Sequence, residues 1–230
     1  MTDTGERVFS QAVEDYVKAI YKLQRQQEVV STNALAKQMG TSAAAATKMI
    51  KNLSSLRLAE HTPYYGVRLT PAGEKVALEV IRHHRLLELY LHQALGYSWD
   101  EVDAEAEKLE HHISEEFEER IERMLDYPHT DPHGDPIPTR DGTIAPDRGI
   151  PLSDSEPGDT LIVRRVRDGD PEVLRYLTRM GVGLQSVVAV TEKQPFNGPL
   201  TVEIDGKTHT LGRELAGHVF VESYEPQEEA

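Results

Sequence analysis

Four side chains able to ligate a metal ion recur at helical spacing between residues 103 and 111. At positions i, i+4, i+7 and i+8, they are Asp103, Glu107, Glu110 and His111. This spacing places them on one face of a helix, where carboxylate oxygens and an imidazole nitrogen one turn apart can converge on a divalent ion. The alternative interpretation is a solvated acidic helix face, and the spacing alone does not decide between the two.

A second pair of the same kind lies on the preceding predicted helix. His84 and Glu88 are four residues apart, and an antiparallel arrangement of the two helices would bring both faces together. The chain contains no cysteine, which excludes disulfides, thiolate zinc sites and iron–sulfur clusters. Any bound metal must therefore be held by carboxylates, imidazoles and carbonyls.

A third set of possible ligands lies in a proline-rich segment. Its members are His129, Asp131, His133 and Asp135. Six prolines between residues 127 and 152 indicate an extended connector. We expect these four side chains to be solvated rather than to bind metal.

The elements that precede the acidic helices form a DNA-binding pattern. An amphipathic helix is predicted over residues 10–27, and a short helix from about 32 to 39 ends at a glycine turn. The third helix buries an apolar face, and two helices joined by such a turn are typical of a helix-turn-helix. Residues 57–62 and 67–70 flank a Pro-Tyr-Tyr-Gly turn, which predicts a two-stranded wing.

Three further helices and a small barrel are expected downstream. A long helix runs over about 71–95, a capping box at Ser98–Glu101 opens another that reaches about His112, and Ser114 caps the last. That last helix carries an apolar stripe, which makes it a candidate dimer surface. Beyond the connector, four short strands separated by turn signals suggest a small barrel: 160–166, 186–192, 200–204 and 218–223.

Length, charge and hydropathy limit the class of protein. The 230 residues suit two modest domains, and no apolar run approaches the roughly 18 residues of a membrane span. No secretory signal is visible, so a cytoplasmic location is expected. The net charge is −14, yet residues 1–75 hold ten Lys or Arg against seven Asp or Glu. A basic module at one end is compatible with DNA binding.

The chain resembles the diphtheria toxin repressor family of metal-dependent transcription regulators, and within it the manganese-responsive members. The similarity is continuous over about residues 10–140, with a weaker barrel-like tail. The matching segments are AVEDYVKAIYKL, LAKQMGTSAAAATKMIKNL, LTPAGE, HHRLLELYL, EAEKLEHHIS and PHGDPIP.

The resemblance implies specific metal ligands. The family's first site maps onto Asp15, Glu107, Glu110 and His111. Where iron-responsive members carry methionine and cysteine, this chain has Asp15 and Glu107, and hard oxygen ligands favour manganese. Lys18 replaces a carboxylate of the compact binuclear members, so an ancillary site of His84, Glu88 and Asp103 is favoured instead. Asp170 and Glu172 in the barrel are possible additional ligands.

The exposed face of the third helix and the wing are expected to contact DNA. Helix N-terminal amides and hydroxyls can hold phosphates, alanines allow close approach to bases, and lysines can reach base edges or phosphates. The expected contact residues are Thr41, Ser42, Ala44, Ala45, Lys48, Lys51, Tyr64 and Tyr65. Hairpin packing is an equally plausible role for the two tyrosines.

The expected fold is mainly α with small β: a winged helix-turn-helix (1–72), a helical metal-binding and dimerisation domain (73–140), a linker (141–152) and an SH3-like β-barrel (153–226). We expect a homodimeric regulator, by analogy a repressor of metal-uptake genes, that binds a double-stranded DNA operator when Mn²⁺ is bound. No enzyme activity, membrane partner or organic cofactor is expected. The alternatives are an Fe²⁺-responsive member of the family, a winged-helix regulator with an organic effector, and a metal-dependent enzyme. Other divalent metals are expected to bind in vitro.

Overall fold

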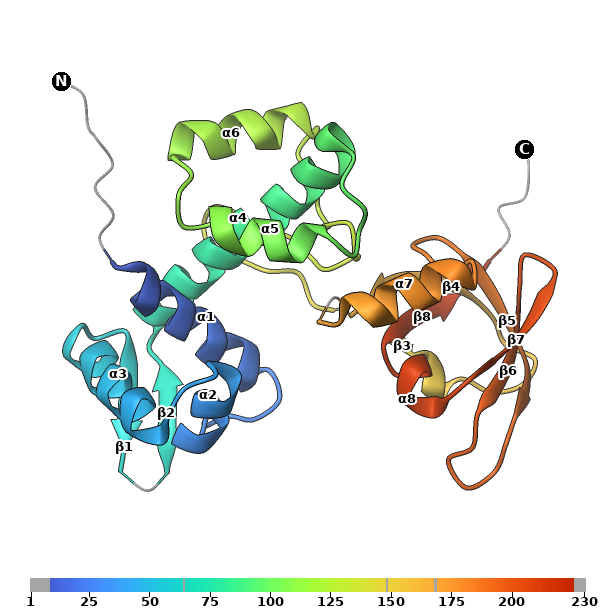
Figure 1. Ribbon diagram of the computed structural model, residues 1–230, viewed down its shortest axis with the longest axis horizontal. Coiled ribbons are helices and arrows are strands. Elements are labelled where there is room, and N and C mark those ends of the chain that lie inside the picture. Colours follow the sequence, from blue (N-terminus) through green and yellow to red (C-terminus); the bar gives the residue numbers. More distant parts are fainter. Residues whose placement is uncertain (1–8, 64, 148, 168, 226–230) are drawn as a thin grey trace. The chain divides into compact units, whose positions relative to one another are not determined.

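The structure is a computed structural model that describes residues 9–63, 65–147, 149–167 and 169–225 (Figure 1). These residues divide into two units. The first contains the chain up to Leu86 together with Glu107–Asp126 and Pro138–Ile144, and the second contains Leu87–Ala106, Tyr127–Ile137 and the chain from Ala145 onward. The fourth and fifth helices therefore contribute to both units.

The first unit begins with the predicted winged helix-turn-helix, drawn in blue to cyan in Figure 1. Its elements are α1 (Gln11–Gln24), α2 (Thr32–Gln38), α3 (Ala43–Ser55), β1 (Ala59–Thr62) and β2 (Gly66–Leu69). The i, i+3, i+4 spacing of apolar residues turns one face of each helix inward, so that Ile20, Leu35 and Ile50 are fully buried together. Gly40 takes a positive φ of 59° between α2 and α3, which glycine adopts without strain.

Three more helices follow: α4 (Pro71–Leu95), α5 (Val102–Leu109) and α6 (Glu115–Met124). The expected helix from Ser98 to about His112 is shorter at both ends. Glu101 does accept hydrogen bonds from Ser98, but the helix proper starts at Val102. It ends at Leu109 because the chain must reach the extended N-cap conformation of Ser114, whose hydroxyl accepts from the amide of Phe117. Glu110 and His111 consequently lie in a turn, and the prediction of a single helical face was wrong.

The second unit is built around a six-stranded antiparallel sheet in the order β3-β8-β4-β5-β6-β7. This is the SH3-like domain expected from the sequence. Its elements are β3 (Ile150–Pro151), the 3₁₀ turn η1 (Leu152–Asp154), β4 (Thr160–Val166), α7 (Pro171–Arg179), β5 (Val187–Lys193), β6 (Leu200–Ile204), β7 (Lys207–Leu211), α8 (Arg213–Ala216) and β8 (Val219–Ser223). Side chains that alternate along each strand point inward, and those of the adjacent strands β4, β5 and β6, such as Val163, Val188 and Val202, form part of its core.

Two of these strands were not predicted. β7 is an edge strand with the polar sequence KTHTL, of which only Leu211 is buried, so the alternation that marks a half-buried strand is weak. The turn that produces it was visible, because Asp205 and Gly206 both have positive φ and close the β6–β7 hairpin. β3 contains only two residues and pairs with β8.

The connector differs most from the expectation. Asp131, His133 and Asp135 are buried rather than solvated, whereas His129 is exposed. Gly134 explains the close packing: its φ is +88°, and a Cβ atom there would lie 2.1 Å from the carbonyl oxygen of Arg164 on β4. The amide of Val166 donates to the carbonyl of His133 at 2.9 Å, which fastens the connector to the sheet.

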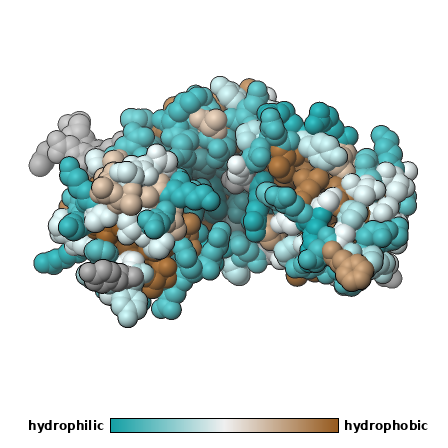
Figure 2. Space-filling model, turned by 60° about the horizontal axis from the view of Figure 1, so that its bottom comes forward, coloured by the Kyte–Doolittle hydropathy of each residue, from teal (hydrophilic) through white to brown (hydrophobic). Residues whose placement is uncertain are grey.

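The face shown in Figure 2 is largely hydrophilic, with separate hydrophobic patches. Among the described residues, no helix combines the length and the hydropathy that a membrane-spanning segment requires.

Candidate metal centre

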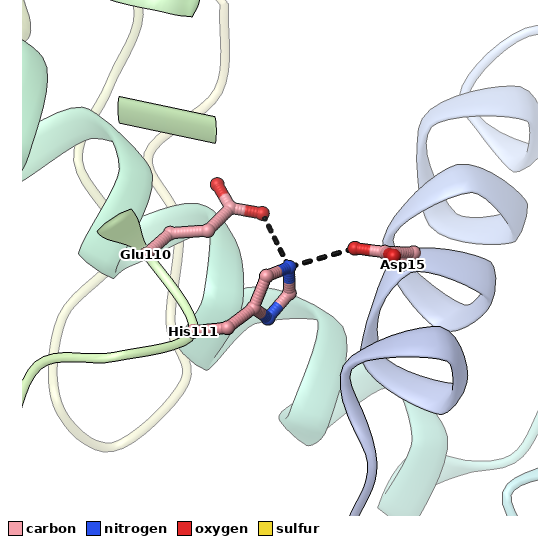
Figure 3. Close-up of side chains that lie close together, drawn as sticks. All are labelled: Asp15, Glu110 and His111. Atoms are coloured by element: carbon pink, nitrogen blue, oxygen red, sulfur yellow. Dashed lines mark ion pairs between the residues drawn. The ribbon is translucent and has the colours of Figure 1, made fainter. Parts of the chain in front are cut away.

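One imidazole nitrogen in the first unit contacts carboxylates from two distant parts of the chain. His111 Nε2 lies 2.7 Å from Asp15 Oδ1 and 3.1 Å from Glu110 Oε1 (Figure 3). Asp15 is on α1, while Glu110 and His111 lie in the turn after α5. The three side chains offer ligand atoms that all lie within 4.8 Å of one another. An ion bound there would join the first helix of the helix-turn-helix to this turn.

Glu14 orients the ring, a role that the sequence did not reveal. Its Oε2 lies 2.6 Å from His111 Nδ1. A carboxylate on one ring nitrogen fixes the orientation of the imidazole and directs the other nitrogen toward a ligand position. No periodicity could have identified Glu14, because adjacent residues on a helix point about 100° apart and its partner is 97 positions away.

The electrostatics of this cluster favour its charged forms. Burial alone would lower the pKa of His111, but hydrogen bonds with Asp15, Glu110 and Glu14 raise it to about 11. Burial would raise the pKa of Glu110, whereas its contacts with His111, His84 and Lys18 hold that pKa well below its ordinary value. In the absence of an ion, a proton on His111 therefore supplies positive charge between the carboxylates.

A second group of ligand atoms adjoins the first and encloses an ammonium. His84, Glu107 and Glu110 offer ligand atoms within 4.8 Å of one another. The Lys18 Nζ lies 2.7 Å from Glu107 Oε2, 2.7 Å from Glu110 Oε2 and 3.4 Å from His84 Nδ1. Lys18 is buried, and although burial lowers its pKa, the two carboxylates raise it above the ordinary value. The four ligands expected for the first site therefore fall into two groups that share Glu110. Asp15 and His111 belong to one group, and Glu107 belongs to the other, where it contacts Lys18.

A buried ion-pair cluster supports the turn from the side of α4 and α6. Glu118 pairs with the guanidinium of Arg82, which also donates to the carbonyl of Pro138 at 2.7 Å. His83 connects this cluster with the metal ligands, since its Nδ1 donates to the carbonyl of Glu110 at 3.2 Å and its Nε2 lies 3.3 Å from Glu118 Oε2. The backbone of Glu110 is thereby held in place.

The ligands expected for an ancillary site fall partly in the second unit. His84 belongs to the first unit, whereas Glu88 and Asp103 belong to the second, where their carboxylate oxygens lie within 4.8 Å of each other. Asp170 is the N-cap of α7 and accepts from the amide of Glu172 at 2.8 Å. Both of these barrel residues are exposed, and neither belongs to a ligand group within the described part of the chain.

Helix α3 presents the surface expected to face DNA. Ser42 is its N-cap and accepts from the amide of Ala45 at 3.2 Å, which leaves the serine hydroxyl proton available for a phosphate. The remaining expected residues of this helix are exposed: Ala44, Ala45, Lys48 and Lys51. Thr41, in the turn before the helix, is half-buried.

The wing offers one aromatic side chain within the described residues. Tyr65 is 79% exposed at the tip of the β1–β2 hairpin, so packing within the hairpin does not explain its presence. Tyr64, the other expected contact, lies outside the described residues.

Three family models together match most of the chain. Residues 8–67 match "Iron dependent repressor, N-terminal DNA binding domain", residues 70–139 match "Iron dependent repressor, metal binding and dimerisation domain", and residues 150–223 match "FeoA domain".

The chain is also similar to known proteins in sequence and in structure. The chain is 30% identical over 222 residues to the iron-dependent repressor IdeR of Mycobacterium tuberculosis, covering 91% of this chain and 96% of that protein. It is 38% identical over 104 residues to the transcriptional regulator MntR of Escherichia coli, covering 45% of this chain and 66% of that protein. A solved manganese-dependent transcriptional repressor in complex with manganese is 41% identical, with a TM-score of 0.85, covering 92% of this chain and all of that one.

Proposed function

This chain belongs to the family of iron-dependent repressors that includes the diphtheria toxin repressor, and we propose that it is activated by Mn²⁺ to bind operator DNA as a homodimer. Members of this family are DNA-binding transcriptional repressors rather than enzymes. The observation that carries the proposal is the contact of His111 Nε2 with both Asp15 and Glu110.

The position of this contact suggests how binding of an ion would affect DNA recognition. Asp15 lies on α1, which packs against α2 and α3 in one core, whereas His111 lies 96 positions further along the chain. An ion held by both would fix the angle between the helix-turn-helix and the α5–α6 turn. Without it, Asp15, Glu110 and Glu14 depend on the His111 proton to offset their repulsion. Couplings of this kind commonly change affinity by about 5–150-fold.

The donor set suits manganese. Asp15 and Glu110 offer hard carboxylate oxygens, His111 offers an imidazole nitrogen, and the chain has no thiolate. Because Mn²⁺ is the weakest binder among the first-row divalent ions, selectivity would rest on this choice of donors and on metal supply rather than on raw affinity. Repression of metal-uptake genes is the corresponding physiological role.

Lys18 supports a single ion at this centre. Its ammonium contacts Glu107, Glu110 and His84, the three side chains that could otherwise hold a neighbouring second ion. A second cation would have to displace a buried positive charge that is tethered to α1. We therefore assign one ion to the centre formed by Asp15, Glu110 and His111, with Lys18 serving as a permanent neighbouring cation.

The surface of α6 supports dimerisation. Phe117 is 41% exposed and Met124 is 56% exposed, whereas Ile121 of the predicted apolar stripe is buried within the unit. Exposed apolar side chains on an otherwise highly charged helix fit an interface between two copies of the chain. A dimer would place two α3 helices so that each can enter a major groove.

The test measures DNA binding with the metal supplied and withheld. Labelled promoter DNA is taken from upstream of the gene for this protein and from upstream of a manganese-transporter gene. Its fluorescence anisotropy, which rises when protein binds, is measured first in chelator and then in Mn²⁺ or Fe²⁺. We expect binding that appears with Mn²⁺, and we expect His111→Asn to lose the metal response. His112→Asn is the matched control, because His112 is the exposed neighbour of His111.

The outcomes separate the alternatives. Equal activation by Fe²⁺ and Mn²⁺ would retain metal regulation and remove the argument for manganese, leaving the iron-responsive alternative. Binding that is independent of metal, or a response that survives His111→Asn, would overturn the proposed role of this centre. An organic effector would then be the leading alternative.

A further inference from the structure

A second buried group of ligand atoms lies entirely within the second unit. Glu88 of α4 and Asp131 and His133 of the connector offer ligand atoms within 4.8 Å of one another. Their exposed fractions are 0%, 2% and 0%. None of the contacts described for the first centre involves them. Two carboxylates and an imidazole removed from water therefore meet where the sequence predicted only a solvated connector.

The hydrogen bond on the far side of His133 fixes its tautomer. His133 Nε2 lies 2.7 Å from the carbonyl oxygen of Trp99, which can only accept, so Nε2 carries the proton. Nδ1 has no hydrogen-bond partner among the described residues and lies 3.6 Å from Glu88 Oε1. In the neutral ring, the Nδ1 lone pair is thus directed toward a carboxylate. A backbone carbonyl on one nitrogen and a free lone pair on the other is the usual arrangement of a metal-ligating histidine.

The connector holds this arrangement firmly. Asp131 Oδ1 accepts from the amides of His133 at 2.8 Å and Asp135 at 3.0 Å, which closes a tight turn around Gly134. Asp135 Oδ1 in turn lies 3.5 Å from Nη1 of Arg165 on β4. The ring of His133 also stacks on Trp99, whose indole nitrogen donates to Thr178 on α7. The ligand atoms are therefore positioned by fixed backbone before any ion arrives.

We propose that Glu88, Asp131 and His133 bind a divalent first-row transition-metal ion, which gives the second unit a metal site of its own. Two carboxylates and one imidazole match the donor preferences of Mn²⁺ and Zn²⁺. A cation there would offset two buried negative charges and would occupy the space that the His133 lone pair faces. It would fasten the connector to α4. This site goes beyond the proposed function, because it lies outside the centre formed with Asp15.

The test counts ions in a protein that lacks the first centre. In the full-length His111→Asn background, Mn²⁺ bound per chain is measured by equilibrium dialysis with Mn²⁺ alone as the probe. We expect His133→Asn and Asp131→Asn each to weaken the remaining site on the order of 10–100-fold. His129→Asn is the matched control, since His129 is exposed on the same connector. Asp131→Asn preserves the oxygen that accepts from the two amides, so it tests charge rather than folding.

Glu88 is also an expected ligand of the ancillary site, so a further variant distinguishes the two ligand sets. If Asp103→Asn removes the ion while His133→Asn retains it, the ion belongs to the ancillary set and this proposal is overturned. Equal Mn²⁺ binding by His133→Asn and His129→Asn would mean that this cluster does not hold the ion, which overturns the proposal as well. Because ions are counted without DNA, a failed DNA-binding test would leave this result unaffected.

A measurement on the unsubstituted chain guards against variants that do not fold. Zn²⁺ is diamagnetic, so its largest effect on a ring ¹⁵N resonance is at the nitrogen that it ligates. Upon addition of Zn²⁺, we expect the Nδ1 resonance of His133 to shift strongly while the ring resonances of His129 stay unchanged. An unchanged His133 Nδ1 resonance at a Zn²⁺ concentration that shifts those of His111 would contradict the proposal.

Discussion

Two buried groups of carboxylates in the first unit are neutralised in different ways. Around Glu118, the positive charge comes from Arg82, a guanidinium that stays protonated and fixes the carboxylate from a planar fork. Around Glu110, it comes from His111 and Lys18, an imidazole that can lose its proton and an ammonium on a flexible stem. His83 lies between the two, contacting the backbone of Glu110 and the side chain of Glu118.

The difference shows that the cluster around Glu118 is structural, whereas in the cluster around Glu110 a metal ion can replace the proton of His111. An arginine cannot give up its charge to make room for a metal ion, so the Arg82–Glu118 pair is suited to hold α4 against α6 permanently. The His111 ring becomes a ligand as soon as its proton leaves. The fixed Arg82–Glu118 pair therefore adjoins the His111–Glu110 contact, whose proton an ion can replace. His83 contacts both Glu118 and the backbone of Glu110 and so links the two.

The largest effect is expected on the free energy of unfolding, when the cluster around Glu118 is broken. Glu118→Gln removes one of the two carboxylates that pair with the buried Arg82 and leaves its guanidinium with Glu122 alone, 2.7 Å from Nη2. This should destabilise the protein by about 3 kcal/mol. Urea unfolding in chelator measures this loss. At temperatures where the variant is folded, Mn²⁺ should still bind at the first centre. A variant as stable as the parent would contradict the assigned role.

The lowered pKa of Glu118 also predicts how the stability of the protein changes as the pH falls. Burial would raise the pKa of Glu118, but His83 and Arg82 lower it to about 2. Since the pKa in the folded state lies below that in the unfolded state, the stabilisation is complete above the ordinary glutamate pKa of about 4.5. It is lost as the pH falls from there through 2. In Glu118→Gln this part of the acid dependence should be missing.

A smaller effect is expected from the orientation of the metal ligand. Glu14→Gln keeps a hydrogen-bond acceptor for His111 Nδ1 but removes the charge, so Mn²⁺ affinity should fall on the order of 10–100-fold without loss of folding. Isothermal titration calorimetry measures the affinity. Glu28→Gln, at a side chain that is 87% exposed, serves as the control and should bind as the parent does. Unchanged affinity in Glu14→Gln would mean that Glu14 only pairs with the protonated ring.

The smallest expected effect is a pH dependence of Mn²⁺ affinity at the centre formed by Asp15, Glu110 and His111. Because the pKa of His111 is raised to about 11 without metal, an ion must displace a proton, and Mn²⁺ affinity should rise by up to roughly tenfold for each pH unit below that value. Titrations between about pH 6.5 and 8.5 measure the slope. Arg82 and Glu118 both stay charged over this range, so their pairing should not change, whereas His83 beside them has a raised pKa and adds a pH dependence of its own to stability. A flat metal affinity would contradict the protonated state of His111.

The local sequence was sufficient where a short-range rule applies. Ser114 caps α6 as predicted, and the apolar spacing of Ile50 and Leu53 predicts the buried face of α3. Strands β4 and β6 also occupy the predicted residues, because apolar alternation between turns is a local property. The types of the metal-ligating side chains were readable for the same reason.

The tertiary structure decided which of those side chains meet. α5 ends at Leu109, so Glu110 and His111 are directed by a turn rather than by helical spacing, and Glu14 reaches His111 from another element. The burial of His133 depends on the close packing of Gly134 against the backbone of Arg164 on β4. No local sequence pattern predicts this contact between the connector and a strand. Residue types and helix periods follow from interactions between neighbours in sequence. The partners of a buried charge follow from packing, which the sequence encodes only through the whole fold.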